Sequence, residues 1–379
     1  MARGKSRFKS GNRRFSAVAL VEITVSLGGI GLFLLPPPAN WIEMHYSRGI
    51  YPHMQRIITA ASNVLPVALF DVLMLFLIVA PVWWWIRLKR AGRGHRFKEV
   101  LALAFHTLCA GALAILIFQM VWGLNYSRLP LTAKLDYDQS RVTPASIEDL
   151  RRTCITELNS TCGEAHSIPW PVSSKWQELL KPSFESVVKE LGTDGGTTPG
   201  RIKHSLFNFY LAASGIDGFI NPYGLESILN DRLIAVEQPF AIAHEWGHLA
   251  GFADESEANF IALLTCLGSG NIQIRYAGWL ALLPNLPEAQ SDQKPAEPEL
   301  QLDPRVMADL SEIAQHWRAD LRPWVNAAQW RFYDRFLKAN HVEAGVASYG
   351  LFVRLVAGTK FSGNWVPEQA EIGSMRGAH

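Results

Sequence analysis

The sequence has little cysteine and little charge for its length. Four cysteines in 379 residues exclude a small disulfide-stapled scaffold. Basic residues number 36 against 34 acidic ones, and this net charge of only +2 argues against a protein that binds nucleic acid through a general basic field. Charged residues make up 18% of the chain and apolar residues 49%, which excludes a disordered chain and indicates that part of the protein lies in lipid.

Positive charge is concentrated in the first quarter of the chain. Residues 1–98 contain 14 Lys/Arg and three acidic residues, a balance of +11, whereas the remainder contains 22 and 31, a balance of −9. Three apolar runs, residues 17–35, 64–86 and 100–122, each reach about 18 residues or more, the length at which a helix crosses the hydrocarbon layer. We therefore expect a membrane domain at residues 1–124, with three transmembrane helices in contact with the lipid bilayer.

The distribution of basic residues predicts the orientation of these helices. Residues 1–15 and 87–98 each carry six basic groups, whereas the connection between the first two runs carries only Arg48 and Arg56. By the positive-inside rule the N-terminus is cytoplasmic, which places residues 125–379 in the periplasm, outside a bacterial inner membrane. The alternative for the first run is a cleaved signal peptide, but the run is long for one and lacks a small-residue cleavage site before Pro36.

Three ionisable residues, Glu22, Asp71 and His106, lie within the apolar runs. Ionisable groups at membrane depth are candidates for a functional role. Glu22 is near the cytoplasmic end of its run, where its side chain can reach the headgroups. Asp71 and His106 are able to pair between helices.

From Asn125 onward the chain is expected to form a mostly helical domain with a small sheet. Helical spacing occurs at residues 202–213, 306–317, 328–340 and 349–357, while residues 216–220 and 225–229 can form two short strands around the turn Asn221-Pro222-Tyr223-Gly224. The glycine-rich residues 192–200 and the proline-rich residues 284–304 read as loops.

Two cysteines of this domain, Cys154 and Cys162, have seven residues between them. A disulfide between them is chemically permitted on the outer side of the membrane, and two free thiols are the alternative that the sequence leaves open. Cys109 lies within the third apolar run and Cys266 on an apolar helix face, so both are expected to be packing residues.

One segment carries the residue pattern of a metal-dependent hydrolase. His244 and His248 are four positions apart, so on a helix both imidazoles emerge from one face and can bind one metal ion. Pro239 and Gly251 supply start and stop signals for that helix. Glu245 lies beside the first histidine, where its carboxylate can act as a general base toward water at the ion. The apolar neighbours indicate a buried helix, and two buried histidines beside a carboxylate are costly without a metal.

A catalytic zinc site takes three protein ligands and leaves one position open for water. Asp254 fits the spacing H-E-x-x-H-x-x-G-x-x-D, in which it replaces the third histidine of a metzincin. Asp254 and Glu257 also fit the N-cap and third position of a new helix, as a capping box. Glu255 is then free for the metal, with Asn259 four residues later on the same face to orient a ligand histidine. We expect Glu255 as the third ligand, with Asp254 and Glu257 as alternatives.

The order of several elements resembles an uncharacterised family of bacterial membrane proteins with a predicted zinc-metallopeptidase-like domain. The elements are a G-L-N-Y-x-R sequence, an N-P turn, the H-E-x-x-H motif, an E-x-E-A-N-F run and a G-V-x-S-Y-G sequence; they are found here at Gly123–Arg128, Asn221-Pro222, His244–His248, Glu255–Phe260 and Gly345–Gly350. The resemblance covers nearly the whole sequence and implies a zincin-like α+β domain that binds zinc.

A more distant resemblance is to the membrane-bound heat-shock and CAAX-type metalloproteases, which are gluzincins. Their E-x-x-A-D element aligns with Glu255–Asn259. Because this chain has Asn259 where those enzymes have Asp, the residue can accept a hydrogen bond from a ligand histidine but supplies no negative charge. His248 and Glu255 are also closer in sequence than in those enzymes, so the chain must turn sharply at Gly251.

A residue that stabilises the transition state is expected beside the metal, usually Tyr, His or Arg. Arg275, Tyr276 and Tyr349 fit by residue type and by their place in family-like segments. The strand expected around Gly218–Ile220 can align an extended peptide by edge pairing.

These observations lead to the hypothesis of a membrane-anchored zinc metallopeptidase. Zn²⁺ on His244, His248 and Glu255 would polarise a scissile carbonyl, and Glu245 would pass a proton from water to the leaving amine. The alternative is a non-catalytic binding or scaffold protein with a structural or vestigial metal site, which Asn259 favours and the retained Glu245 opposes. The same ligands accept other divalent ions, and the peptide or protein substrate is not identified by the sequence.

Overall fold

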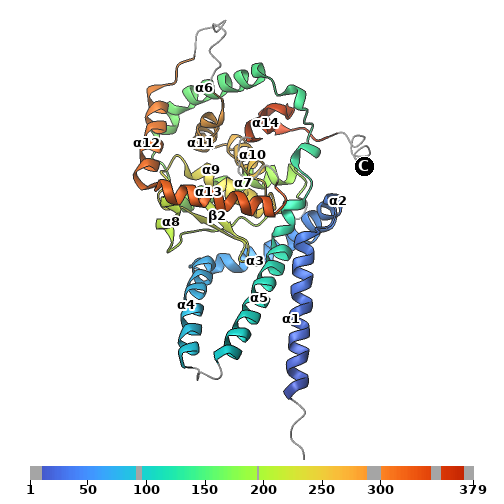
Figure 1. Cartoon of the computed structure of the whole chain (residues 1–379). Helices are drawn as coiled ribbons and strands as arrows, with labels where there is room; N and C mark the ends of the chain where they lie inside the picture. Colours follow the sequence, from blue (N-terminus) through green and yellow to red (C-terminus); the bar gives the residue numbers. More distant parts are fainter. Residues whose placement is uncertain (1–10, 91–95, 194–195, 288–299, 343–350, 371–379) are drawn as a thin grey trace, which may run out of the picture.

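The computed structural model describes residues 11–90, 96–193, 196–287, 300–342 and 351–370. Its first part consists of α1 (Gly11–Leu34), α2 (Ala39–Trp41), the π-helical segment η1 (Ile42–Ile50), α3 (Tyr51–Val64), α4 (Leu69–Arg90) and α5 (Arg96–Val121). In Figure 1, α1, α4 and α5 extend from one side of a rounded, mostly helical body that the rest of the chain forms.

Two helices are long and apolar enough to cross a membrane. α4 and α5 have 22 and 26 residues, and only 6% of the most apolar window of each is buried within the protein. At 1.5 Å per residue they are about 33 and 39 Å long. The part of α1 from Glu22 to Leu34 meets the same test when it is taken together with Ala39–Val64, which follows at an angle of 110°.

The predicted spans 17–35, 64–86 and 100–122 fall on α1, α4 and α5, but the second begins later than expected. Leu65 precedes Pro66 and has an extended backbone, which ends α3 at Val64 and delays α4 to Leu69. The connection between the first two runs is also helical, although the charge count treated it only as a loop. Apolar residues recur there at roughly helical spacing, and three of them, Ile42, Tyr46 and Tyr51, are buried against the body.

Asp71 and His106 each have another partner. His106 Nδ1 lies 3.5 Å from Glu22 Oε1, so α5 pairs with α1 instead. Asp71 lies in the first turn of α4, where its carboxylate accepts hydrogen bonds from the Ser205 hydroxyl and the Leu206 N–H. α4 and α5 run in opposite directions in Figure 1, and Asp71 is in the first turn of α4, whereas His106 is in the first half of α5.

The body is mostly helical with a small sheet, as the sequence predicts. Its elements are η2 (Gly123–Ser127), η3 (Leu131–Ala133), η4 (Gln139–Arg141), α6 (Pro144–Ser167), α7 (Ser173–Glu190), β1 (Ile202–Lys203), α8 (Asn208–Ser214), β2 (Gly218–Asn221), β3 (Glu226–Leu229), α9 (Gln238–Leu249), α10 (Glu255–Leu267), α11 (Ile272–Leu282), η5 (Leu283–Asn285), α12 (Pro304–Asp320), α13 (Pro323–Ala339), α14 (Leu351–Gly358), β4 (Phe361–Ser362), η7 (Gly363–Trp365) and β5 (Val366–Pro367).

The three-stranded sheet has the order β1-β3-β2. β2 and β3 form the predicted antiparallel hairpin, with Gly218 opposite Leu229, and β1 runs parallel to β3. The helix expected at residues 202–213 is wrong in its first half. Ile202 and Lys203 pair with β3, and this backbone pairing outweighs their helical spacing, so the helix begins only at Asn208.

α9 and α10 pack against each other in the centre of the body, next to α7 and α11 (Figure 1). All residues of α10 except Asn259 are buried. A Cβ at Gly247 would be in van der Waals contact with the Ala258 Cα, at 3.4 Å, so the two helices pack closely at this point. Each large apolar side chain buried here contributes about 1.5–3 kcal/mol, which makes the pair a rigid support for the residues it carries.

The four cysteines are free thiols. Cys154 and Cys162 are both on α6, and eight positions along a helix separate their Cα atoms by about 12 Å. A disulfide needs Cα atoms less than about 7 Å apart, so these two cannot form one. Their sulfhydryls donate instead to the carbonyls of Trp279 and Asn159.

Candidate metal centre

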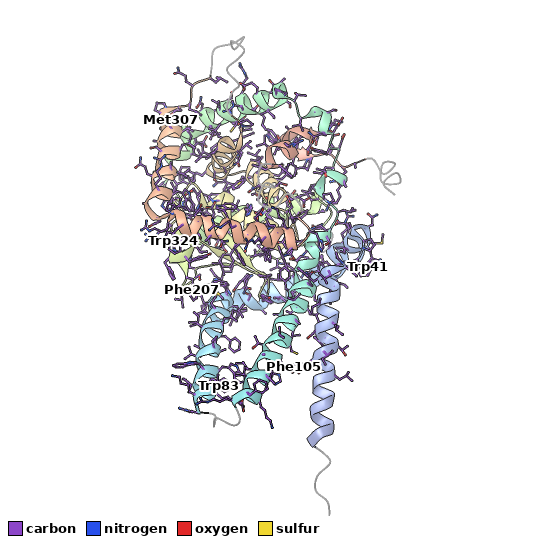
Figure 2. The ribbon with its side chains drawn as sticks, viewed as in Figure 1. Trp41, Trp83, Phe105, Phe207, Met307 and Trp324 are labelled. Carbon is purple, nitrogen blue, oxygen red and sulfur yellow. The ribbon has the colours of Figure 1, made fainter. Side chains whose placement is uncertain are left out.

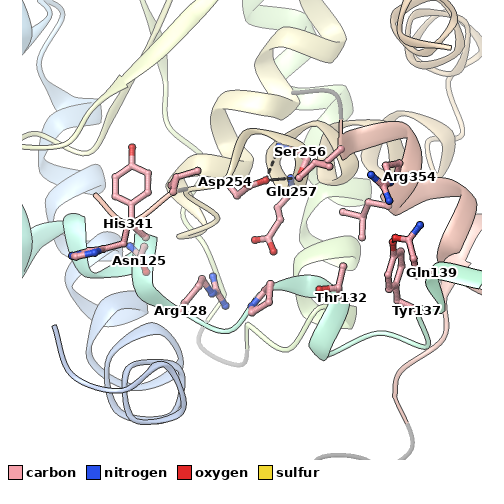
Figure 3. A pocket seen from close by; sticks show the side chains of 15 residues that line it. Asn125, Arg128, Thr132, Tyr137, Gln139, Asp254, Ser256, Glu257, His341 and Arg354 are labelled. Atoms are coloured by element: carbon pink, nitrogen blue, oxygen red, sulfur yellow. Dashed lines mark hydrogen bonds between the residues drawn. The ribbon is translucent and has the colours of Figure 1, made fainter. Parts of the chain in front are cut away.

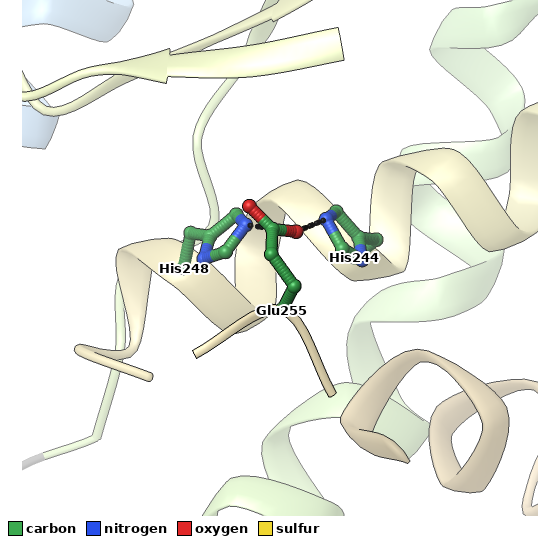
Figure 4. A group of neighbouring side chains, drawn as sticks. All are labelled: His244, His248 and Glu255. Atoms are coloured by element: carbon green, nitrogen blue, oxygen red, sulfur yellow. Dashed lines mark ion pairs between the residues drawn. The ribbon is translucent and has the colours of Figure 1, made fainter. Parts of the chain in front are cut away.

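The turn between α9 and α10 brings an acidic residue back to the histidine pair. α9 ends at Leu249, Gly251 has φ +85°, and α10 begins at Glu255. Glu255 Oε2 lies 3.2 Å from His244 Nε2 and 3.5 Å from His248 Nε2, as Figure 4 shows. The three potential ligand atoms are all within 4.8 Å of one another. Glycine adopts this φ without strain, so Gly251 permits the reversal.

Hydrogen bonds on the far side of each ring determine which nitrogen carries the proton. His248 Nδ1 lies 2.8 Å from the Phe252 carbonyl oxygen, which can only accept, and His244 Nδ1 lies 2.8 Å from Asn259 Oδ1. Both Nδ1 atoms therefore donate, and in the neutral rings both Nε2 lone pairs face Glu255. Glu255 Oε2 itself accepts no hydrogen bond within the described residues. Three electron-pair donors converge, and they repel one another unless a proton or a metal ion lies between them.

The charges of the cluster also favour a cation. Burial lowers the pKa of His244. Burial also lowers the pKa of His248, but the negative charges of Glu255 and Glu245 outweigh it and raise the value to about 9. For Glu255, burial raises the pKa, and the two histidines together bring it well below its ordinary value. A divalent metal ion bound to all three groups would displace protons from them and supply positive charge in their place.

Glu245 lies in α9 with one carboxylate oxygen unsatisfied. The residue is 2% exposed, and its Oε2 accepts no hydrogen bond from the described residues. A Cβ at Gly218 would lie 2.9 Å from Glu245 Oε1, so β2 passes at a distance that only glycine allows. Burial raises the pKa of Glu245 to about 8; His248 opposes this shift, and Glu255 and Asp217 add to it. A carboxylate with a free oxygen and a high proton affinity suits a general base.

Two tyrosines that the sequence analysis did not select belong to this site. Tyr333 of α13 donates its hydroxyl hydrogen to Glu255 Oε1 and so orients the carboxylate. Burial raises the pKa of Tyr126 well above its ordinary value, and the negative charges of Glu255 and Asp254 raise it further. Tyr126 lies in the G-L-N-Y element, so that sequence motif could have pointed to it. Tyr333 is 78 positions from Glu255 and lies in no motif, so only the fold reveals it.

The two alternative ligands have other partners. Asp254 caps α10, with its carboxylate 2.8 Å from the Ser256 N–H and 3.3 Å from the Glu257 N–H. The Glu257 side chain accepts a hydrogen bond from the Leu131 N–H and does not close the expected capping box, because η3 offers it a buried donor. The structure therefore brings Glu255, and neither alternative, to the histidine pair.

The residues expected to stabilise a transition state are not brought to the cluster by the contacts of the described residues. Arg275 donates to the Ser269 carbonyl at 3.0 Å. Tyr276 is fully buried and donates its hydroxyl hydrogen to Asp309. Both lie on α11, where these partners hold them, and nothing in the local sequence signals such distant partners. Tyr349 lies outside the described residues.

A cavity of about 500 Å³ adjoins the start of α10 (Figure 3). Asp254 and Glu257 line it, whereas the three cluster residues do not. Arg128, Arg354 and Tyr126 also belong to its wall, so the cavity carries groups of both charges. Tyr126 thus borders the cavity and also feels the charge of Glu255.

The strand beside Glu245 has an outer edge without a partner strand among the described residues. β2 pairs with β3 on its other side. Gly218 and Phe219 are half-buried, whereas Ile220 and Asn221 are buried. Edge pairing with an extended peptide is therefore open only at the first two residues of β2, which are at the end that contacts Glu245.

The fold and the site define a mostly helical protein with two or three helices able to span a membrane and a buried His-His-Glu group able to hold a metal ion. Residues 46–357 match the model of a family described as protein of unknown function (DUF3810). This is most of the chain, so the chain belongs to that family. No curated protein and no solved structure matches the chain. The expectation of an uncharacterised family is thus confirmed, while no comparison links the chain to metallopeptidases of the heat-shock or CAAX type.

Asn259 is expected to strengthen metal binding, because its Oδ1 holds the His244 ring with Nε2 toward Glu255. Asn259→Ala removes this acceptor, so the affinity for zinc should fall about 10- to 100-fold. Asn259→Asp keeps an acceptor and adds charge, so it should bind zinc at least as tightly as the natural chain. Competition with a chromogenic chelator measures both affinities, and equal values for all three proteins would show that Asn259 does not orient a ligand.

Proposed function

We propose that the protein is a membrane-anchored, zinc-dependent peptidase. The observation that carries this proposal is the convergence of His244 Nε2, His248 Nε2 and Glu255 Oε2 beside the unsatisfied carboxylate of Glu245. Ligands of these types and this number leave the fourth position of a tetrahedral zinc site open. A structural site needs no further carboxylate next to its ligands, so Glu245 favours hydrolysis.

A bound zinc ion supplies a Lewis acid for water and for a scissile carbonyl. Glu245 Oε2, which accepts no hydrogen bond from the described residues, takes a proton from the attacking water and delivers it to the leaving amine. Tyr333 and Asn259 hold Glu255 and His244 in the orientation that the reaction needs. The accessible end of β2 holds an extended peptide beside Glu245.

The proposed anchor is residues 1–124, and the proposed catalytic domain is residues 125–379. α4 and α5 have the length and composition of membrane spans, and α1 has them together with the helix that follows it. The six basic residues before Ser16 and the six within residues 87–98, from the last turn of α4 to the first turn of α5, favour a cytoplasmic N-terminus. We infer from this orientation a periplasmic catalytic domain on a bacterial inner membrane.

A structural metal centre in a scaffold or binding protein is the alternative. The side chains of His244, His248 and Glu255 are only 15%, 9% and 4% exposed, which restricts the access of a substrate to the centre. Asn259 supplies no negative charge to its histidine, which weakens the polarising power expected of the ion. These features favour the alternative, and the carboxylate of Glu245 opposes it.

Metal analysis combined with a peptide-library assay tests the proposal. The full-length protein purified in detergent is expected to hold one equivalent of zinc and to cleave library peptides. A chelator should abolish cleavage, and added zinc should restore it. Zinc without any cleavage would support the structural alternative, whereas a protein that binds no divalent metal would refute both functions. Parallel loading with iron, cobalt and manganese identifies the preferred ion.

A further inference from the structure

The helical segment at residues 39–64, which follows α1 at an angle of 110°, has an exposed apolar face. In Figure 1, α3 lies across the ends of α4 and α5 that meet the body, rather than along them. One face of this segment, residues 39–64, packs on the body. The opposite face exposes large apolar side chains: Met44 is 67% exposed, Ile57 70% and Val64 78%. Such exposure is unusual for a soluble surface and continues directly into the apolar surface of α4.

Residues 206–209, at the start of α8, present apolar side chains beside the same end of α4. Leu206 and Phe209 are 72% and 71% exposed. Asp71 of α4 accepts a hydrogen bond of 2.9 Å from the Leu206 N–H, and the Phe70 and Phe207 rings meet edge to face with centroids 6.3 Å apart. Figure 2 shows Phe207 at this end of α4. These contacts with α4 therefore hold Leu206 and Phe207 next to the end of that helix.

The charges of the segment 39–64 suit a phospholipid surface. Arg48 and Arg56 are exposed among the apolar side chains, with two exposed histidines, His45 and His53. The segment contains one acidic residue, Glu43, which is buried and pairs with basic groups. Amphipathic helices with exposed apolar and basic residues lie in the headgroup layer of anionic membranes.

We propose that residues 39–67 and residues 204–210 lie in the headgroup layer of the bilayer, with their exposed apolar side chains at the boundary of the acyl chains. This inference rests on the membrane anchoring of the proposed function and goes beyond it. The occupant of the surface is phospholipid, because the surface is continuous with that of α4, which begins five residues after Val64.

Residues 39–67 are connected by a hydrogen bond to one of the helices that build the metal centre. The Tyr51 hydroxyl donates to the carbonyl of Leu249, the last residue of α9, at 3.0 Å. At the turn after β2, the Tyr223 hydroxyl lies 3.4 Å from the Ala114 carbonyl of α5. β2 therefore runs from contact with a membrane helix to contact with Glu245, a length of about 13 Å for four residues. A peptide paired with Gly218 and Phe219 would lie about one strand length from this contact with α5, so a membrane-proximal segment of a lipid-anchored or membrane-spanning polypeptide fits as the substrate.

Spin labels on introduced cysteines test the depth of this surface. The full-length protein with Cys109→Ala, whose other three cysteines are buried, is placed in vesicles of phosphatidylethanolamine and phosphatidylglycerol. Ile57→Cys and Phe209→Cys probe the proposed interface, and Ile78→Cys probes the exposed surface of α4. Met307→Cys is the matched control, because Met307 is 53% exposed and lies far from the membrane helices in Figure 2.

Collision rates with oxygen and with a water-soluble nickel complex give the depth of each label. We expect the residue 78 label deep in lipid, the residue 57 and 209 labels at the shallow depth of the headgroups, and the residue 307 label in water. Labels at 57 and 209 as accessible to nickel as that at 307, with 78 in lipid, would overturn the inference and leave the membrane anchor intact. A label at 78 in water would overturn the anchor and this inference together. Neither result depends on whether the centre hydrolyses peptides.

Discussion

Glu245→Gln is expected to lower kcat/KM for peptide cleavage about 10²- to 10⁴-fold and to leave one equivalent of zinc in the protein. The amide has the size of the carboxylate but cannot take a proton from water, so the loss is that of a general base. The three ligand atoms belong to His244, His248 and Glu255 and are unchanged. The measurement is the steady-state rate with the library peptide that the natural chain cleaves fastest, together with the zinc content of the same sample.

Glu178→Gln is the matched control for this experiment. This substitution makes the same chemical change on α7, where the Glu178 side chain is 69% exposed and its Oε2 lies 2.7 Å from Lys175 Nζ. It should retain the full rate and the full zinc content. An unchanged rate in Glu245→Gln would refute the proposed mechanism, and loss of zinc in that variant would mean that Glu245 helps to hold the ion rather than to move a proton.

Glu43→Gln is expected to reduce the free energy of unfolding by about 3–5 kcal/mol. Glu43 lies 3.1 and 3.2 Å from two nitrogens of Arg128 and 3.1 Å from Lys134 Nζ, and both basic side chains are 4% exposed. Removing the carboxylate takes from two buried cations the acidic group that is hydrogen-bonded to both of them. Arg128 also donates to the Gly251 carbonyl at 2.9 Å, so this network holds the turn between α9 and α10. Equilibrium unfolding in detergent, followed by tryptophan fluorescence, measures the change.

Arg48→Gln separates the buried part of this network from its exposed part. Arg48 is 40% exposed and pairs with the same carboxylate at 3.1 Å. Because solvent screens an exposed pair, its removal should change the free energy of unfolding by less than about 1 kcal/mol. Equal losses in Arg48→Gln and Glu43→Gln would show that burial of Arg128 and Lys134 is not the source of the effect.

The stabilising contribution of Glu43 should also depend on pH. Burial raises its pKa, but Arg128 and Lys134 outweigh burial and lower it from 4.5 to about 2. A carboxylate with a lowered pKa in the folded state stabilises fully above its unfolded pKa and loses this contribution as pH falls toward its folded pKa. The stability difference between the natural chain and Glu43→Gln should therefore shrink as pH falls from about 4.5 to 2. A difference that does not change over this range would contradict the assignment.

Local sequence patterns were sufficient for the elements whose signal lies within one segment. The apolar runs fall on α1, α4 and α5, because a span needs only about 20 consecutive residues of one character. The hairpin of β2 and β3 follows from a turn sequence between two short apolar runs. His244, Glu245 and His248 lie on one helix, where a spacing of four places two side chains on one face.

The same reasoning failed where a distant part of the chain decided the outcome. Residues 202–203 became a strand because β3 lies beside them. Asp71 binds the chain before α8 rather than His106, because the body meets that end of α4. Arg275 and Tyr276 were expected near the metal, but their hydrogen bonds lie elsewhere. Periodicity within a segment carries no information about such partners.

The sequence by itself determined that this chain has apolar helices long enough for a membrane and a helix that presents two histidines with an acid between them. Only the tertiary structure decided which of Asp254, Glu255 and Glu257 reaches those histidines. Consecutive helical residues point in directions about 100° apart, so the choice depends on the turn at Gly251 and on the close packing of α9 against α10. The contact of Tyr333 with Glu255 likewise exists only because the folded chain brings α13 to the start of α10.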